Sequence, residues 1–132
     1  MKVSSGEVSV QATDQKIYSI INNFSNFESV LPEQVKDWEK GDDYCRFSVD
    51  GMITLTLRVL EKSEFSKVVF KADNDHNIPI LFSFLINAQG DRATLELETE
   101  VEVPMLLSGM VKKPLQTFVD KTAEKIKTAA EK

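Results

Sequence analysis

The sequence is poor in the residues that form disulfides and catalytic pairs. Its one cysteine, Cys45, excludes an internal disulfide. Because Cys45 lies in an alternating apolar run, we interpret it as a small core residue in a reducing compartment. The one histidine, His76, lies in the polar segment 73–77, with no serine or cysteine placed to pair with it in a known motif. We interpret His76 as a solvated loop residue and predict no catalytic residue.

Long apolar runs are absent too. No stretch approaches the length of a membrane span, and residues 1–7 lack the apolar segment of a signal peptide. The 21 acidic residues outnumber the 16 basic ones, and the resulting net charge of −5 repels a phosphate backbone. These absences predict a cytoplasmic protein with no stable membrane insertion and no nucleic-acid partner. They leave protein partners unknown.

What is present suffices for one domain. The chain has 132 residues, of which 42% are hydrophobic. A chain of this size buries roughly 70% of the surface that it exposes when unfolded, so it needs no disulfide or metal to hold a core. No repeat, linker or low-complexity tract divides it. We therefore predict a single domain over residues 1–132.

The first third of the chain predicts one strand and two short helices. Apolar and polar residues alternate over residues 8–12, as in a half-buried strand. Thr13 is placed to cap a helix, whose apolar face is Ile17, Tyr18, Ile20, Ile21 and Phe24. Ser25 and Glu28 have the spacing of a capping box and predict a second helix, which Pro32 ends. That helix presents Phe27, Val30 and Leu31.

Six further strands follow. The first ends at the Gly41-Asp42-Asp43 turn, and the other five have apolar residues at alternating positions. We place them at residues 35–40, 45–49, 53–59, 68–72, 80–86 and 95–103. Together with the first strand they predict a seven-stranded antiparallel sheet with one face on a core.

The turn after the second of these six strands decides a register. A two-residue Asp50–Gly51 turn would set Phe47 opposite Thr54 and mix an apolar face with a polar one. A three-residue loop of residues 49–51 sets Phe47 opposite Ile53 instead. Because a slip of one residue turns a whole face over, burial favours the three-residue loop. Gly51 then supplies the left-handed residue that such a loop needs.

From Met105 the apolar period changes to that of a helix, which runs to the C-terminus. Its apolar face is Leu107, Met110, Val111, Phe118, Thr122, Ile126 and Ala129. Pro114 and Gly109 weaken the helix and predict a kink or break between Met105 and Leu115. The bend either wraps the helix around the sheet or serves as a hinge that moves a lid. That lid would comprise Met105, Leu106, Leu107 and Met110.

Two acidic patterns resemble metal sites, and we reject both. Asp73, Asp75 and Asn77 imitate the start of a calcium loop, but Ile78 stands where glycine must turn the chain, and Phe84 stands where the closing glutamate belongs. Glu96, Glu98, Glu100 and Glu102 project from one face of a strand, which we interpret as its water-facing side, with Arg58 and Lys71 softening the repulsion.

Three stretches resemble the START and birch-pollen-allergen superfamily (SRPBCC), and within it the small bacterial polyketide-cyclase-like proteins. They are Asn26-Phe27 to Leu31-Pro32, Gly51-Met52, and Lys113-Pro114-Leu115-Gln116 with Phe118. The resemblance implies an α+β helix-grip fold. In it a curved seven-stranded antiparallel sheet has two short helices after strand 1 and a long C-terminal helix packed on its concave face. Members bind lipids, sterols, plant hormones or polyketides; some are cyclases, and others assist membrane quinones or bind protein partners.

The leading hypothesis is a noncatalytic binder of a small apolar or amphipathic ligand, such as a lipid, sterol or polyketide-like molecule. The ligand would lie between the sheet and the last helix, with no cofactor and no metal. The predicted lining is Phe47, Leu55, Leu57, Phe70, Phe82, Phe84, Leu97, Met110 and Phe118. The same residues also suit a filled core.

Two alternatives remain open at this stage. A cyclase or dehydrase would need an inward polar group, for which Tyr18, Ser83 and Thr99 are the candidates. A protein-interaction module would have a filled core and an exposed apolar patch around Trp38 or Phe65. Phe65, at a polar hairpin tip, either closes a cavity mouth or folds back on the sheet.

Overall fold

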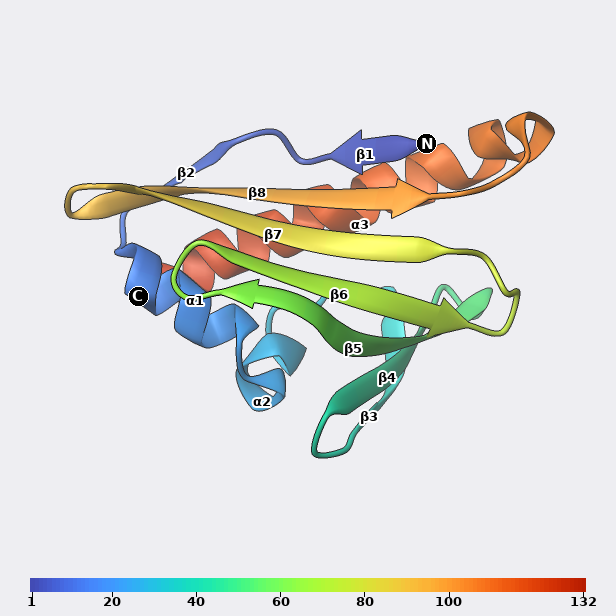
Figure 1. Ribbon diagram of the computed structural model, residues 1–132, viewed down its shortest axis with the longest axis horizontal. Coiled ribbons are helices and arrows are strands. Elements are labelled where there is room, and N and C mark those ends of the chain that lie inside the picture. The colour runs from blue at the N-terminus through green and yellow to red at the C-terminus, as the bar shows by residue number, and fades with distance from the viewer.

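The computed structural model describes residues 1–132, except for the side chain of Leu107. One antiparallel sheet carries three helices on a single side, and α3 runs behind β7 and β8 (Figure 1). The strands are β1 Lys2–Ser4, β2 Val8–Val10, β3 Val35–Lys40, β4 Tyr44–Val49, β5 Ile53–Ser63, β6 Lys67–Asn74, β7 Ile80–Gln89 and β8 Arg92–Val101. The helices are α1 Asp14–Ile21, α2 Phe24–Glu28 and α3 Met105–Ala130. The α+β class and the curved antiparallel sheet are confirmed.

The sheet has eight strands rather than the predicted seven. Its order is β1-β8-β7-β6-β5-β4-β3, and β2 also pairs with β8. The first strand of the prediction is thus two short strands along one partner, separated at Gly6, whose φ is +69°. A positive φ at glycine bends the chain at no steric cost. Residues 4–6 are Ser-Ser-Gly and show no apolar alternation, so the sequence pattern did not indicate the extra strand.

Local capping explains both short helices. The Thr13 side chain accepts a hydrogen bond from the Lys16 amide and begins α1, as predicted. The predicted start of α2 is wrong: Asn23 is the cap and accepts from the amides of Ser25 and Asn26. Phe24 therefore belongs to α2 and not to the face of α1.

The β4–β5 hairpin has a three-residue loop, but one residue later than predicted. Val49 pairs with Ile53, and Phe47 pairs with Leu55, so the loop is residues 50–52. Asp50 and Gly51 both have positive φ, 54° and 66°, and the Met52 amide donates to the Val49 carbonyl. Aspartate tolerates this left-handed conformation. Asp50 and Gly51 therefore form a tight turn, and Met52 is the third residue of the loop. The partner of Phe47 thus moves by two positions, from Ile53 to Leu55. Because side chains alternate with a period of two, the same apolar face of the hairpin stays covered.

Helix α3 starts at Met105, as predicted, and continues through Pro114 to Ala130, so it is not broken between Met105 and Leu115. A kink within this span stays a prediction. The second half of α3 is tied to neighbouring elements. The Gln116 side chain donates to the Ser4 carbonyl, and the Gln11 amide donates to the Glu131 carboxylate. The first turns project past the end of the sheet (Figure 1). Leu107 was predicted to lie on the apolar face of this helix, but its side chain is outside the described part of the structure.

Aromatic rings fill the interior at the end of the molecule where α2 lies. Phe27 stacks on Phe70 at 5.9 Å, and both meet Phe84 edge-on at 5.7 Å. All three are buried. The prediction that Phe84 and Phe82 face the core beneath the helices is therefore confirmed.

Two buried hydroxyls in this interior are unsatisfied. Thr99 on β8 and Thr122 on α3 are fully buried, and their Oγ1 atoms have no hydrogen-bond partner among the described residues. A buried polar group without a partner costs about 1–3 kcal/mol, whereas an apolar group of the same shape costs little.

Thr99→Val should therefore raise the free energy of unfolding by about 1 kcal/mol, as measured by urea denaturation. Thr94→Val is the matched control, because Thr94 lies on the same strand and its hydroxyl donates to Glu7. We expect little change from this control. A loss of stability in Thr99→Val would show that its hydroxyl has a hydrogen-bond partner.

Cys45 is fully buried on β4, as predicted. Burial raises the pKa of its thiol from 9.0 to about 12, despite an opposing backbone hydrogen bond from Leu57. The unfolded thiol therefore loses its proton at a lower pH than the folded one. This difference favours the unfolded state as the pH rises above 9.

The stability of the wild type relative to Cys45→Ala should be constant below pH 9 and fall toward pH 12. The slope is at most about 1.4 kcal/mol per pH unit. Denaturant titrations of both proteins over this range measure it. Parallel curves for the two proteins would contradict the burial argument.

Candidate functional site

A cavity of about 250 Å³ lies between the sheet and the N-terminal half of α3. Its walls come from the β4–β5 hairpin, the β6–β7 loop, the facing ends of β7 and β8, and one side of α3. The lining residues are Val49, Asp50, Met52, Ile53, Leu55, His76, Ile78, Ile80, Phe82, Val101, Val103, Met110, Val111, Pro114, Leu115 and Phe118. Fourteen of these sixteen are apolar.

Regular periodicity in each element explains why these side chains meet. On α3, Val111, Leu115 and Phe118 recur at the spacing of one helix face. On the sheet, Ile80 pairs with Val101 across β7 and β8, so both point to the same side. The hairpin adds Val49 and Ile53 as a third wall by the same cross-strand rule.

Two rings close the inner end of the cavity. Phe82 and Phe118 lie 5.5 Å apart, centroid to centroid. Phe118 also stacks on Phe47 at 6.4 Å, and Phe47 stacks on Trp38 at 6.1 Å. This row of rings separates the cavity from the filled core around Phe84. The cavity is thus confined to the end of the molecule where α3 begins.

The two titratable side chains of the lining, Asp50 and His76, belong to loops at the cavity rim. The Nε2 atom of His76 lies 2.9 Å from the Met52 carbonyl oxygen and ties the β6–β7 loop to the β4–β5 hairpin. The neighbouring Asp75 reinforces this link, because its carboxylate accepts from the Thr54 amide at 3.2 Å. The site is therefore apolar inside and polar at its edge.

His76 was correctly predicted to lie in an exposed loop, but its place at the rim was missed. About half of its side chain is exposed, and it lines the cavity. Nothing in its neighbours along the sequence signals this position. The contact with Met52 joins residues 24 positions apart and arises only when the two loops meet.

The predicted ligand-binding residues divide into two groups. Leu55, Phe82, Met110 and Phe118 line the cavity. The other five lie buried in the core and not in the lining: Phe47, Leu57, Phe70, Phe84 and Leu97. Ligand binding by any of them stays a prediction. Sequence reasoning missed Val111, Pro114 and Leu115, although their spacing from Phe118 is a detectable signal.

The three inward polar candidates for catalysis do not gather around the cavity. Tyr18 lies on α1 and meets the Phe65 ring edge-on at 5.5 Å. Ser83 alternates with the inward Phe82 and Phe84 and pairs with Glu98 on the opposite face. Thr99 is inward but outside the lining. No two of them share a site among the described residues.

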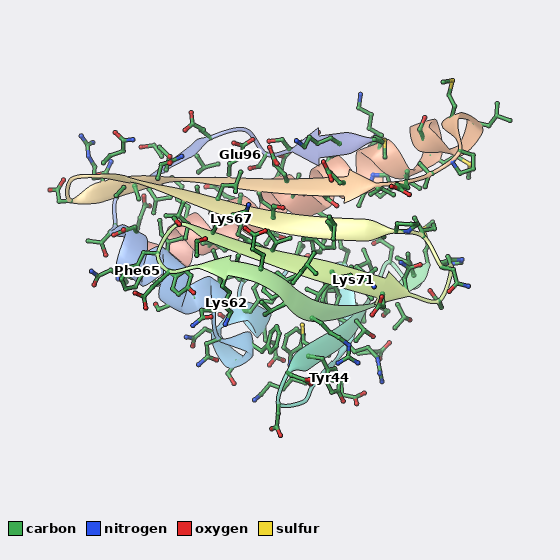
Figure 2. All side chains as sticks on the ribbon, in the orientation of Figure 1. Tyr44, Lys62, Phe65, Lys67, Lys71 and Glu96 are labelled. Carbon is green, nitrogen blue, oxygen red and sulfur yellow. The ribbon has the colours of Figure 1, made fainter. Side chains whose placement is uncertain are left out.

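The sheet's outer face is charged and faces the viewer in Figure 2, where Lys67, Lys71 and Glu96 stand on it. The acidic row on β8 is balanced by Lys2, 3.6 Å from Glu98, and not by the predicted Arg58 and Lys71, which pair with Asp43 and Asp73. No group of three or more potential metal ligands occurs among the described side chains.

The predicted exposed patch around Trp38 or Phe65 is absent. Trp38 is half-buried against Phe47. Phe65 is half-buried against Tyr18, and so folds back rather than closing the cavity. The large apolar side chains most exposed in the described part of the chain are Met52, Leu60, Met105, Leu106 and Met110.

A second hollow, of about 650 Å³, is polar. It lies between the α1–α2 connection and the β3–β4 hairpin, over Phe24 and Phe70. Among its charged residues, Arg58 lies 3.7 Å from Asp43 and also over the Tyr44 ring. Its polar and charged lining suits an apolar ligand less well than the apolar cavity does.

No family model and no curated protein sequence matches the chain. Solved structures match over nearly all of it. A START superfamily protein from Mycobacterium smegmatis is 22% identical with a TM-score of 0.76, covering 98% of this chain and 97% of that one. The KanY protein is 11% identical, with a TM-score of 0.82 and coverage of 100% and 98%. The Aha1 protein of Colwellia psychrerythraea, solved as a dimer, is 10% identical, with a TM-score of 0.70 and coverage of 99% and 96%.

These similarities show a helix-grip fold shared with START-like structures. At such identities they concern the fold alone. Among the described helices, none combines the length and apolar character needed to cross a membrane.

Proposed function

We propose that the chain binds a small apolar or amphipathic molecule in the α3 cavity without transforming it. The observation that carries the proposal is the cavity itself, about 250 Å³ in volume and apolar except at Asp50 and His76. Small-molecule sites typically combine apolar walls with a few polar groups that orient the ligand. The START-like neighbours support a binding fold.

The volume limits the ligand. A cavity of about 150 Å³ holds one benzene ring, and typical drug-sized sites span roughly 300–1,000 Å³. At about 250 Å³ this cavity suits a short acyl chain or a molecule of one or two rings. A whole sterol would require the first turns of α3 to move away from the sheet.

The polar groups at the cavity edge set the ligand's orientation. Its polar end would lie beside His76 and Asp50, and its apolar end against Phe82 and Phe118. The Nε2–H of His76 donates to the Met52 carbonyl, so Nδ1 of the neutral ring can accept a hydrogen bond from a ligand hydroxyl. A neutral hydroxyl is therefore favoured over a carboxylate, which Asp50 and Asp75 would repel.

A titration followed by NMR chemical shifts tests this proposal directly. The ¹⁵N-labelled protein is titrated with 1-decanol, with decanoate and with cholesterol carried by cyclodextrin. We expect decanol to shift residues 110–118 of α3 and the His76 ring, decanoate to act more weakly, and cholesterol to have no effect. Unchanged spectra with all three compounds would overturn the proposal.

A further inference from the structure

Exposed apolar side chains gather at the mouth of the cavity. Met105, Leu106 and Met110 on the first turns of α3 are 89%, 94% and 71% exposed, and Met52 on the facing hairpin is 67% exposed. We call these four residues the apolar rim. Met52 and Met110 also line the cavity, so the rim is continuous with its interior. Contiguous exposed apolar surface of this kind marks an interaction site.

The shape of the rim favours a soft partner. The first turns of α3 project beyond the end of the sheet, so the rim is a protrusion and not a groove (Figure 1). Side-chain hydrogen bonds from α3 to neighbouring strands begin only at Gln116 among the described residues. A stable protein interface needs about 800 Å² on each partner, which a few projecting side chains do not supply. Flexible methionines adapt well to disordered chains such as lipid tails.

Charge indicates the kind of surface that the rim meets. Residues 103–119 contain no acidic residue and carry Lys112 and Lys113, both exposed, in a chain with a net charge of −5. The opposite side of the mouth carries Asp50 and Asp75. Apolar side chains beside lysines are typical of segments that lie in the interface of an anionic bilayer.

We propose that the apolar rim docks the protein, reversibly and without crossing, onto an anionic lipid bilayer. The cavity mouth then opens against the acyl chains, so that a ligand can pass between bilayer and cavity without entering water. The docking step stands on the rim and its lysines. The transfer step rests on the ligand-binding function proposed above.

Vesicle co-sedimentation tests the docking step. The full chain is mixed with vesicles of phosphatidylcholine alone, or with about 30% phosphatidylglycerol. We expect binding to the anionic vesicles that weakens at high salt. Met105→Gln with Leu106→Gln should reduce this binding about tenfold or more. These two residues lie outside the cavity lining, and glutamine is a good helix former.

The matched control removes two exposed apolar side chains elsewhere. Val59 and Leu60 on β5 are 41% and 58% exposed, and neither lines the cavity. Val59→Gln with Leu60→Gln should bind vesicles as the wild type does. A separate variant, Lys112→Gln with Lys113→Gln, should lose about tenfold in binding to anionic vesicles and little to neutral ones.

Several results would overturn docking. These are no binding of the wild type to anionic vesicles, unchanged binding in Met105→Gln with Leu106→Gln, or an equal loss in the β5 control. A wild-type dimer that this rim variant dissociates, without vesicle binding, would assign the rim to self-association instead. Decanol titration without vesicles separates the two proposals. Docking without decanol binding would support the docking surface and overturn only the ligand-binding function.

Discussion

Val111→Trp is expected to lower the affinity for decanol at least about 100-fold, which corresponds to about 2.7 kcal/mol. Val111 is half-buried and lines the cavity on α3, so a larger side chain can enter the hollow without displacing the core. An indole is larger than the benzene ring that a cavity of about 150 Å³ holds, so it would occupy much of a space of about 250 Å³. Amide shifts or calorimetry with decanol measure the loss.

Lys112→Trp is the control for this variant. Lys112 is the next residue of the same helix, but it is exposed and outside the lining. It adds the same indole without filling the cavity, and decanol affinity should stay within about twofold of the wild type. The unfolding curves of both variants show whether the fold survives. Full decanol affinity in a folded Val111→Trp protein would mean that the ligand lies elsewhere.

Phe84→Ala is expected to lower the free energy of unfolding by about 3–5 kcal/mol. Phe84 is buried and meets both Phe27 and Phe70 edge-on at 5.7 Å. Removing its ring leaves a hollow that the surrounding sheet and helices cannot fill. A single domain has only about 5–15 kcal/mol of stability, so the loss is a large share of the total. Urea denaturation at constant pH measures it.

Phe65→Ala provides the comparison at the edge of the fold. Phe65 is half-buried at the β5–β6 turn and has one ring contact, with Tyr18. Its truncation should cost about 1 kcal/mol, because the site opens to water and leaves no closed hollow. Equal losses for the two variants would contradict the closed aromatic core described above.

Strand positions and faces could be predicted because burial follows alternation along the chain. Phe82 and Phe84 are two residues apart, and a sheet with one covered face must turn both inward. The end of α1 and the start of α2 were harder to predict. Ser25 has the sequence spacing of a cap, but Asn23 caps the helix instead. Competing caps two residues apart differ by too little free energy for spacing alone to decide.

The hairpin register shows a similar limit. Burial requires only that Phe47 face the same side as its partner, and both Ile53 and Leu55 satisfy that requirement. The choice between them depends on where the backbone takes positive φ, and Asp50 joins Gly51 in doing so. Aspartate is tolerated there but not required. The sequence therefore permits two loops of equal length, residues 49–51 and residues 50–52.

By itself the sequence determined the α+β class, the order of the main elements, the covered face of the sheet and the long closing helix, since each follows from local periodicity. Tertiary structure alone decided where the interior is hollow. Phe84 and Phe82 look alike in sequence, yet one lies in a filled core and the other borders the cavity. The difference comes from what covers each residue: Phe27 of α2 and Phe70 pack against Phe84, whereas Phe82 meets Phe118 of α3 beside the cavity. The sequence of β7 does not specify these neighbours. The meeting of His76 with Met52 at the rim has the same origin, in loops that approach only after the sheet has formed.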